Sequence, residues 1–96
     1  MTNDKDKIER INKNTRFLAH RIFNHHQEPN YAKAYDKLWS TVYLQHGFNI
    51  GKRLKEVGNE KLSMFDVIDS DELESVLHSS VWLLSIYQEV FNKWVA

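Results

Sequence analysis

The chain has 96 residues, 42% of them hydrophobic and 27% charged, a composition that is ordinary for a folded domain and too apolar for a disordered protein. The absence of cysteine excludes a disulfide framework and a thiolate metal site. The charged N-terminus lacks the apolar centre of a signal peptide, and the longest apolar run, residues 81–84, is too short to span a bilayer. We therefore expect one cytoplasmic domain, residues 1–96, that does not enter a membrane.

The net charge of zero conceals two parts of opposite sign. Residues 1–61 hold twelve Lys and Arg against seven Asp and Glu, a balance of +5, whereas residues 62–96 hold one against six, a balance of −5. An anionic ligand would be drawn to the first part and repelled by the second. Attraction between the two parts, within one chain or between copies, explains the same asymmetry, so both interpretations stay open.

Hydrophobic periodicity predicts an all-α fold with three long helices. The first helix covers about residues 5–24, where apolar residues recur at alternating steps of three and four and form one stripe. The helix is expected to stop before Pro29, which disfavours helical geometry in the residue preceding it.

A second helix is predicted over about residues 31–57. Asn30 is suited to cap its start, and Gly58 is suited to close its end in a left-handed conformation. Gly47 and Gly51 fall inside this helix, where glycine costs about 0.5–1 kcal/mol relative to alanine. Close approach of another helix or of a ligand would explain them, and packing is the commoner cause.

The third helix is predicted over about residues 70–94, with Asp69 or Asp71 at its start and a glutamate three residues after each. Residues 63–68, before it, fit either a short helical turn or an irregular connection. Apolar residues cover more than half of this helix, so it must be buried on more than one side. We expect an antiparallel bundle that forms homo-oligomers through this helix, although a monomer with this helix at its centre explains the same pattern. The expected interface residues are Val81, Trp82, Leu84, Tyr87, Phe91 and Trp94.

The sequence shows no arrangement typical of catalysis. Carboxylate metal centres in helical bundles need Glu-x-x-His pairs on two helices, and this sequence has none. His25 and His26 are adjacent and point to different sides of a helix, which favours a solvated helix end over a metal site. Ser79 and Ser80 lie beside His78, but hydroxyls within a packed helix usually bond to their own backbone. We therefore expect a binding protein that is not an enzyme and uses no cofactor or metal.

Basic and aromatic residues in the first part suit a small anionic ligand better than a nucleic-acid polymer. Arg16 and His20 lie four residues apart on the first predicted helix, and basic residues recur near the end of the second. Arg and Lys neutralise phosphate, and each aromatic face that stacks on a base contributes about 1–3 kcal/mol. A position in the core or at an interface explains an aromatic residue such as Tyr43 equally well.

Residues 44–53 resemble the second helix of the phage anti-CBASS sponge proteins. In that family a Leu-Gln-x-Gly-Phe run is followed by Arg five residues after the Phe. The matching residues here are Leu44, Gln45, Gly47, Phe48 and Arg53. The resemblance covers about residues 8–57. It implies a small helical hairpin that assembles into oligomers and sequesters cyclic oligonucleotide signals of bacterial antiviral defence without cleaving them.

Two features depart from the family's pattern. The family stacks a tyrosine near the start of its first helix on a base, whereas the first tyrosine here is Tyr31. Family members also end soon after the second helix, whereas this chain continues through a third. A relative would therefore have a rebuilt pocket and an additional helix in its assembly.

The leading hypothesis is an oligomeric, phage-encoded sponge that binds a cyclic nucleotide in the host cytoplasm. The residues predicted to bind the ligand are Arg16, His20, Tyr35, Tyr43, Gln45, Phe48, Lys52 and Arg53. One alternative is a helical inhibitor or immunity-type protein that docks on a host or toxin protein through the exposed part of the third helix, around Trp82 and Trp94. The other is a small DNA-binding regulator.

Overall fold

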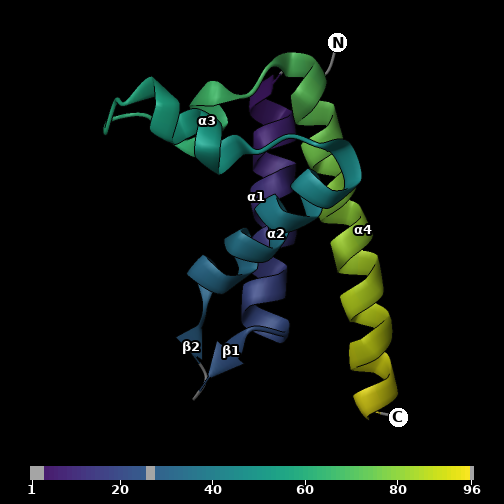
Figure 1. The fold of residues 1–96 in the computed structure, drawn as a ribbon. Helices are drawn as coiled ribbons and strands as arrows, with labels where there is room; N and C mark the ends of the chain where they lie inside the picture. The colour runs from purple at the N-terminus through teal and green to yellow at the C-terminus, as the bar shows by residue number, and fades with distance from the viewer. Residues whose placement is uncertain (1–3, 26–27, 96) are drawn as a thin grey trace.

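The computed structural model describes residues 4–25 and 28–95, which form packed helices and one short hairpin (Figure 1). The all-α prediction is confirmed apart from that hairpin, which pairs Asn24 with Pro29 and His25 with Glu28. None of the described helices is long and apolar enough to cross a membrane. The elements in chain order are α1 (Asp4–Arg21), β1 (Asn24–His25), β2 (Glu28–Pro29), α2 (Tyr31–His46), α3 (Ile50–Val57), the 3-10 helix η1 (Met64–Val67) and α4 (Ser70–Val95).

The helices α1, α2 and α4 enclose the core. α1 and α4 run side by side in the same direction, and α2 crosses them in the opposite sense (Figure 1). Near the start of both helices the Ser70 hydroxyl donates to Asp4 Oδ2 at 2.6 Å, and ten residues further along α4 the Ser80 hydroxyl accepts from Asn14 Nδ2 at 3.1 Å. The core residues common to these helices are Ile11, Leu18, Ala19, Ala34, Leu38, Val42, Leu73, Val76, Leu77 and Leu83.

The predicted single helix over residues 31–57 is wrong, because Gly47 ends α2. Gly47 adopts a φ of 81°, a left-handed conformation that glycine accommodates without strain, and its N–H donates to the Tyr43 carbonyl at 2.9 Å. Asn49 then caps α3 by accepting from the Lys52 N–H at 3.0 Å. A Cβ on Gly47 would meet no atom within 4 Å, so the glycine serves backbone conformation and not close packing.

Other helix ends follow the sequence more closely. The Asn30 side chain accepts from the Lys33 N–H at 3.0 Å, and Gly58 closes α3 with a φ of 70°, so both predicted caps are confirmed. At the start of α4, Glu72 Oε1 accepts from the Asp69 N–H at 3.1 Å, which is one half of the expected capping box. The first helix ends at Arg21 and not at residue 24, because the chain turns there into the hairpin.

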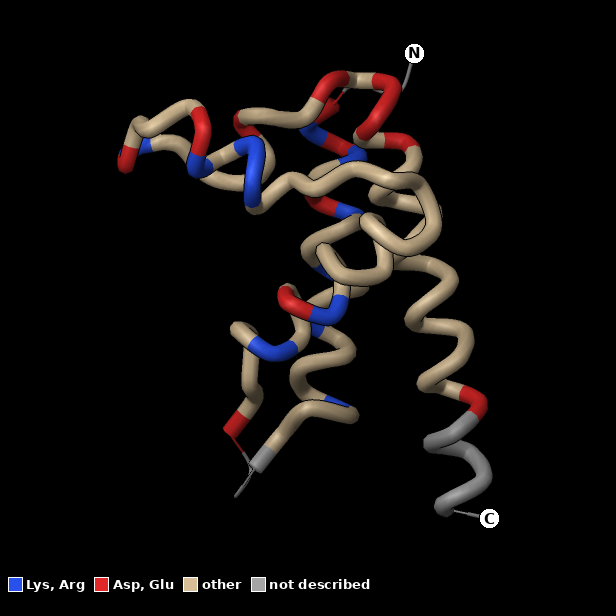
Figure 2. Tube along the Cα trace, in the orientation of Figure 1, with Lys and Arg blue, Asp and Glu red and all other residues tan. Residues whose placement is uncertain are grey.

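Acidic residues gather where α1 and α4 begin, whereas the middle of α4 is uncharged (Figure 2). The two parts of opposite charge are linked within the chain: Lys7 Nζ lies 3.0 Å from Glu74, and Arg53 Nη1 lies 2.6 Å from Glu72. These contacts favour the interpretation that the charge asymmetry holds the parts of one chain together.

Candidate functional site

Three of the predicted ligand-binding residues lie together where α1 faces the start of α2. A cavity of about 380 Å³ is lined by Arg16 of α1 and by Tyr31 and Tyr35 of α2. The hairpin turns the chain so that the Tyr31 hydroxyl lies 2.8 Å from His20 Nε2, and the two rings meet edge to face with centroids 5.5 Å apart. We call Arg16, His20, Tyr31 and Tyr35 the α1–α2 site.

Tyr35 is the most firmly held member of the α1–α2 site. Its ring is half-buried against the core, and its hydroxyl donates to Asn12 Oδ1 at 2.5 Å. Partial burial raises the pKa of Tyr35, and the positive charge of Arg16 opposes that rise. The phenol therefore stays protonated at neutral pH. Held by Asn12 and by the core, it forms one wall of the cavity.

The surroundings of the α1–α2 site are basic and aromatic. Residues 10–27 include four Lys or Arg and no Asp or Glu. The Arg21 guanidinium lies 5.6 Å from the Phe17 ring centroid, and Lys33 Nζ lies 5.4 Å from that of Phe23, both within the range of cation–π attraction. A ligand that enters this site would meet positive potential together with exposed ring faces.

Sequence reasoning missed Tyr31, although it lies one helical turn before Tyr35. The contact between Tyr31 and His20 depends on the hairpin, which returns the chain to α1 over eleven residues. The paired strands have two residues each, too few to leave a periodic pattern. The available signal was the position of Tyr31 directly after the predicted cap, Asn30.

The other predicted ligand-binding residues lie away from the α1–α2 site. Tyr43 is eight residues from Tyr35, about 12 Å along the axis of α2, and lines a separate cavity of about 670 Å³ between α2 and the start of α3. Phe48 packs against the core with its ring stacked on His46, 6.1 Å between centroids. Lys52 is exposed on α3.

Gln45 contributes to the contact between α2 and α4. Its Oε1 accepts from the Ser79 hydroxyl at 2.9 Å, and its side chain lines a groove of about 200 Å³ between these helices. Both hydroxyls were expected to bond to the backbone of their own helix. Ser79 does not, whereas Ser80 does, because its hydroxyl donates to the Leu77 carbonyl at 2.7 Å. The role of Gln45 in this structure is to join two helices.

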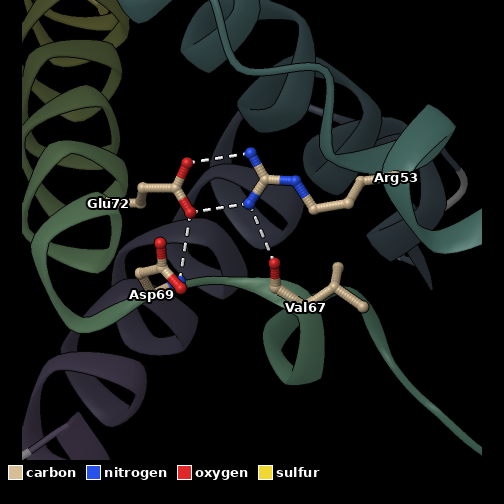
Figure 3. A network of polar contacts seen from close by, with 4 residues as sticks. All are labelled: Arg53, Val67, Asp69 and Glu72. Carbon is tan, nitrogen blue, oxygen red and sulfur yellow. Dashed lines mark hydrogen bonds and ion pairs between the residues drawn. The ribbon is translucent and has the colours of Figure 1, made fainter. Parts of the chain in front are cut away.

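Arg53 is held by protein groups at the junction of α3 with α4 (Figure 3). Its Nη1 and Nη2 donate to the two carboxylate oxygens of Glu72 at 2.6 and 2.8 Å, and Nη1 also donates to the Val67 carbonyl at 2.9 Å. The hydrogen bond to Glu72 raises the pKa of Arg53, and the same bond lowers the pKa of Glu72. This guanidinium fixes α3 and η1 to α4, so an anionic ligand would have to compete with Glu72 for it.

The predicted interface residues on α4 have different surroundings. Val81 and Trp82 are 47% and 48% exposed, whereas Leu84 and Tyr87 pack against the core. The side chains of the other two, Phe91 and Trp94, lie outside the described part of the structure.

Residues 4–25 and 28–95 contain no group of three or more His, Asp or Glu placed to hold a metal ion. Comparisons of the chain with protein-family models, with curated proteins and with solved structures found no significant match. The five residues that resemble the sponge family's motif do not share one helix: Leu44 and Gln45 are in α2, Gly47 and Phe48 follow it, and Arg53 is in α3.

Proposed function

We propose that the protein is a non-enzymatic binding protein that holds a nucleotide-type anion in the α1–α2 site. The observation that carries the proposal is the cavity of about 380 Å³ beside α1, where a guanidinium and two phenol rings converge next to an imidazole. Binding pockets for small molecules span about 300–1,000 Å³, so this cavity suits one nucleotide unit.

Each member of the site has a role that suits such a ligand. Arg16 is exposed, and a guanidinium can bind phosphate through two parallel hydrogen bonds. Tyr31 is 42% exposed and offers a ring on which a base can stack. Tyr35, fixed by Asn12, forms the wall behind them. A ligand with several nucleotides would place one in the cavity and extend the others over the basic surface of α1.

The ligand class that we propose comes from the sequence resemblance of residues 44–53 to the sponge proteins, although these residues lie outside the α1–α2 site and are divided between α2 and α3. On that basis we propose a cyclic oligonucleotide signal, sequestered without cleavage by a phage-encoded protein in the host cytoplasm. The α1–α2 site contains only some of the residues that the sequence predicted to bind the ligand. Lys52 and Arg53 lie outside it, so they are not required to touch the ligand.

Isothermal titration against mononucleotides, cyclic di- and trinucleotides and a short DNA duplex tests the proposal. We expect one or more cyclic nucleotides to bind with micromolar affinity. Arg16→Ala and Tyr31→Ala should weaken binding at least about tenfold, equivalent to about 1.4 kcal/mol. Tyr31→Phe should retain the binding affinity of the wild type. Lys52→Ala is the matched control, because it removes one positive charge outside the site.

Three results would overturn the proposal. The first is the absence of nucleotide binding across the panel. The second is an equal loss of binding in Arg16→Ala and Lys52→Ala, which would indicate attraction to net charge and not a site. The third is binding to the DNA duplex alone, with affinity that falls steeply as salt rises, which would favour a DNA-binding regulator.

A further inference from the structure

The second half of α2, the residues that lead from it into α3, and the middle of α4 carry no Lys, Arg, Asp or Glu. These two segments are residues 38–51 and residues 75–88 (Figure 2). The hydrogen bond between Ser79 and Gln45 joins α2 to α4. We call the exposed surface of these two segments the α2–α4 face.

Large apolar side chains are exposed together on the α2–α4 face. Leu44 is 82% exposed, and Val81 and Trp82 on α4 are 47% and 48% exposed. Leu44 and Trp82 both line the groove of about 200 Å³ between the helices, and Ile86 and Tyr87 continue it along α4. Single exposed apolar residues are ordinary on protein surfaces, whereas a contiguous group around a groove marks an interaction surface.

We propose that the α2–α4 face binds a second copy of this chain across a two-fold axis. A two-fold interface sets one patch against itself, so the patch must carry both a projection and a recess and must not repel its own copy. The α2–α4 face meets both conditions: Leu44 projects beside the groove, and the two segments contain no Lys, Arg, Asp or Glu.

The edge of this face is also compatible with self-association. Asp36 and Lys37 precede the uncharged segment of α2, and Lys37 lines the end of the groove. Two such edges facing each other across a two-fold axis can place the aspartate of one copy near the lysine of the other. The net charge of zero adds no repulsion between copies.

The size of the face predicts weak pairing. The uncharged residues 75–88 of α4 extend about 21 Å, whereas the uncharged residues 38–46 of α2 extend about 14 Å. Two adjacent helices with their side chains are about 20 Å wide. The resulting projected area of about 350 Å² is less than half of the ~800 Å² that each partner buries in a stable complex of standard size. We therefore expect a dimer with a dissociation constant in the micromolar range.

Sedimentation velocity across the micromolar range tests this proposal. Wild-type protein should change from monomer to dimer as concentration rises, and Leu44→Asp should raise the dissociation constant at least about tenfold, equivalent to about 1.4 kcal/mol. Val57→Asp is the matched control, because Val57 is 51% exposed on α3, outside the α2–α4 face. Circular dichroism should show both variants folded, since each replaces an exposed side chain.

A wild-type protein that stays monomeric at every concentration would overturn the proposal, as would a Leu44→Asp variant that dimerises as the wild type does. A stable complex with a different protein through Leu44, without self-association, would also overturn it and favour the inhibitor hypothesis. Dimerisation does not depend on the proposed ligand, so Arg16→Ala should dimerise normally even if no nucleotide binds.

Discussion

The contact between Arg53 and Glu72 provides a quantitative test of how α3 is held to the bundle. Two hydrogen bonds join the side chains, which are 36% and 14% exposed respectively. Removing one partner of a buried pair costs about 3–5 kcal/mol, whereas an exposed pair contributes about 0–1 kcal/mol. Because solvent screens Arg53, we expect a coupling free energy between these limits, about 1–2 kcal/mol.

The assay is a double-mutant cycle with Arg53→Met, Glu72→Gln and the variant carrying both changes. The free energy of unfolding would be measured with urea and followed by circular dichroism at low protein concentration, where dimer formation is minimal. Lys7→Met and Glu74→Gln form the control cycle, in which we expect a smaller coupling because one ion pair joins these side chains and Glu74 is 50% exposed, although Lys7 is only 17% exposed. A coupling between Arg53 and Glu72 no larger than in the control would refute the reasoning.

The coupling free energy between Arg53 and Glu72 should decrease as the pH falls. Hydrogen bonding to Arg53 holds the pKa of Glu72 below its usual value in the folded state. The stabilisation from Glu72 is therefore fully present above the pKa of about 4.3 that a glutamate has when unfolded. It is lost as pH falls through the lower folded value. Coupling that stayed constant after Glu72 was protonated would contradict this assignment.

Further substitutions test the backbone and the core by their free energies of unfolding in urea. Gly47→Ala should destabilise the protein by about 1 kcal/mol because alanine is strained at a φ of 81°. Gly51→Ala, inside α3, would make ordinary contacts with the Met64 methyl at 3.8 Å and Asn49 Oδ1 at 3.9 Å, so it should be neutral or stabilise by up to about 1 kcal/mol. Equal effects would contradict the distinction. Leu38→Ala should cost about 2–5 kcal/mol, because Leu38 is fully buried, and the exposed Leu44→Ala should leave the monomer unchanged. Asn30→Ala should cost about 1 kcal/mol through loss of the cap on α2, and an unchanged free energy would show that the cap contributes nothing.

Helix ends that depend on nearby residues were predictable from the sequence. Asn30 and Gly58 act within one turn of their own positions, so residue type alone indicated both caps. The break at Gly47 also had a local signal, because Asn49 two residues later can cap a new helix. The apolar periodicity continues across this break, however, and periodicity alone cannot distinguish one long helix from two shorter ones.

The α1–α2 site was only partly predictable for a different reason. Arg16, His20 and Tyr35 have residue types that suit an anion, and their spacing on helices could be read directly. Which part of α2 faces α1 depends on the hairpin, so Tyr43 could not be separated from Tyr35 by sequence. Arg53 was predicted to contact the ligand because it is a basic residue near the end of the second predicted helix. Its partner Glu72 could not be recognised from the sequence, because it lies 19 residues away, beyond any helical spacing.

The parallel pairing of α1 with α4 has a consequence for how the protein is made. The residues that meet along this pair, such as Asp4 with Ser70, are 66 positions apart in the chain. Contacts between residues so far apart in the sequence form only after the intervening chain has been ordered. Folding is therefore slower than in a bundle whose contacts join helices that are neighbours in the sequence. During synthesis α1 and α2 leave the ribosome before α4 does, so Leu18 and Leu38 are at first not covered by α4. The nascent chain therefore passes through a stage in which it is vulnerable to aggregation and to proteases, and that stage ends only when α4 is released.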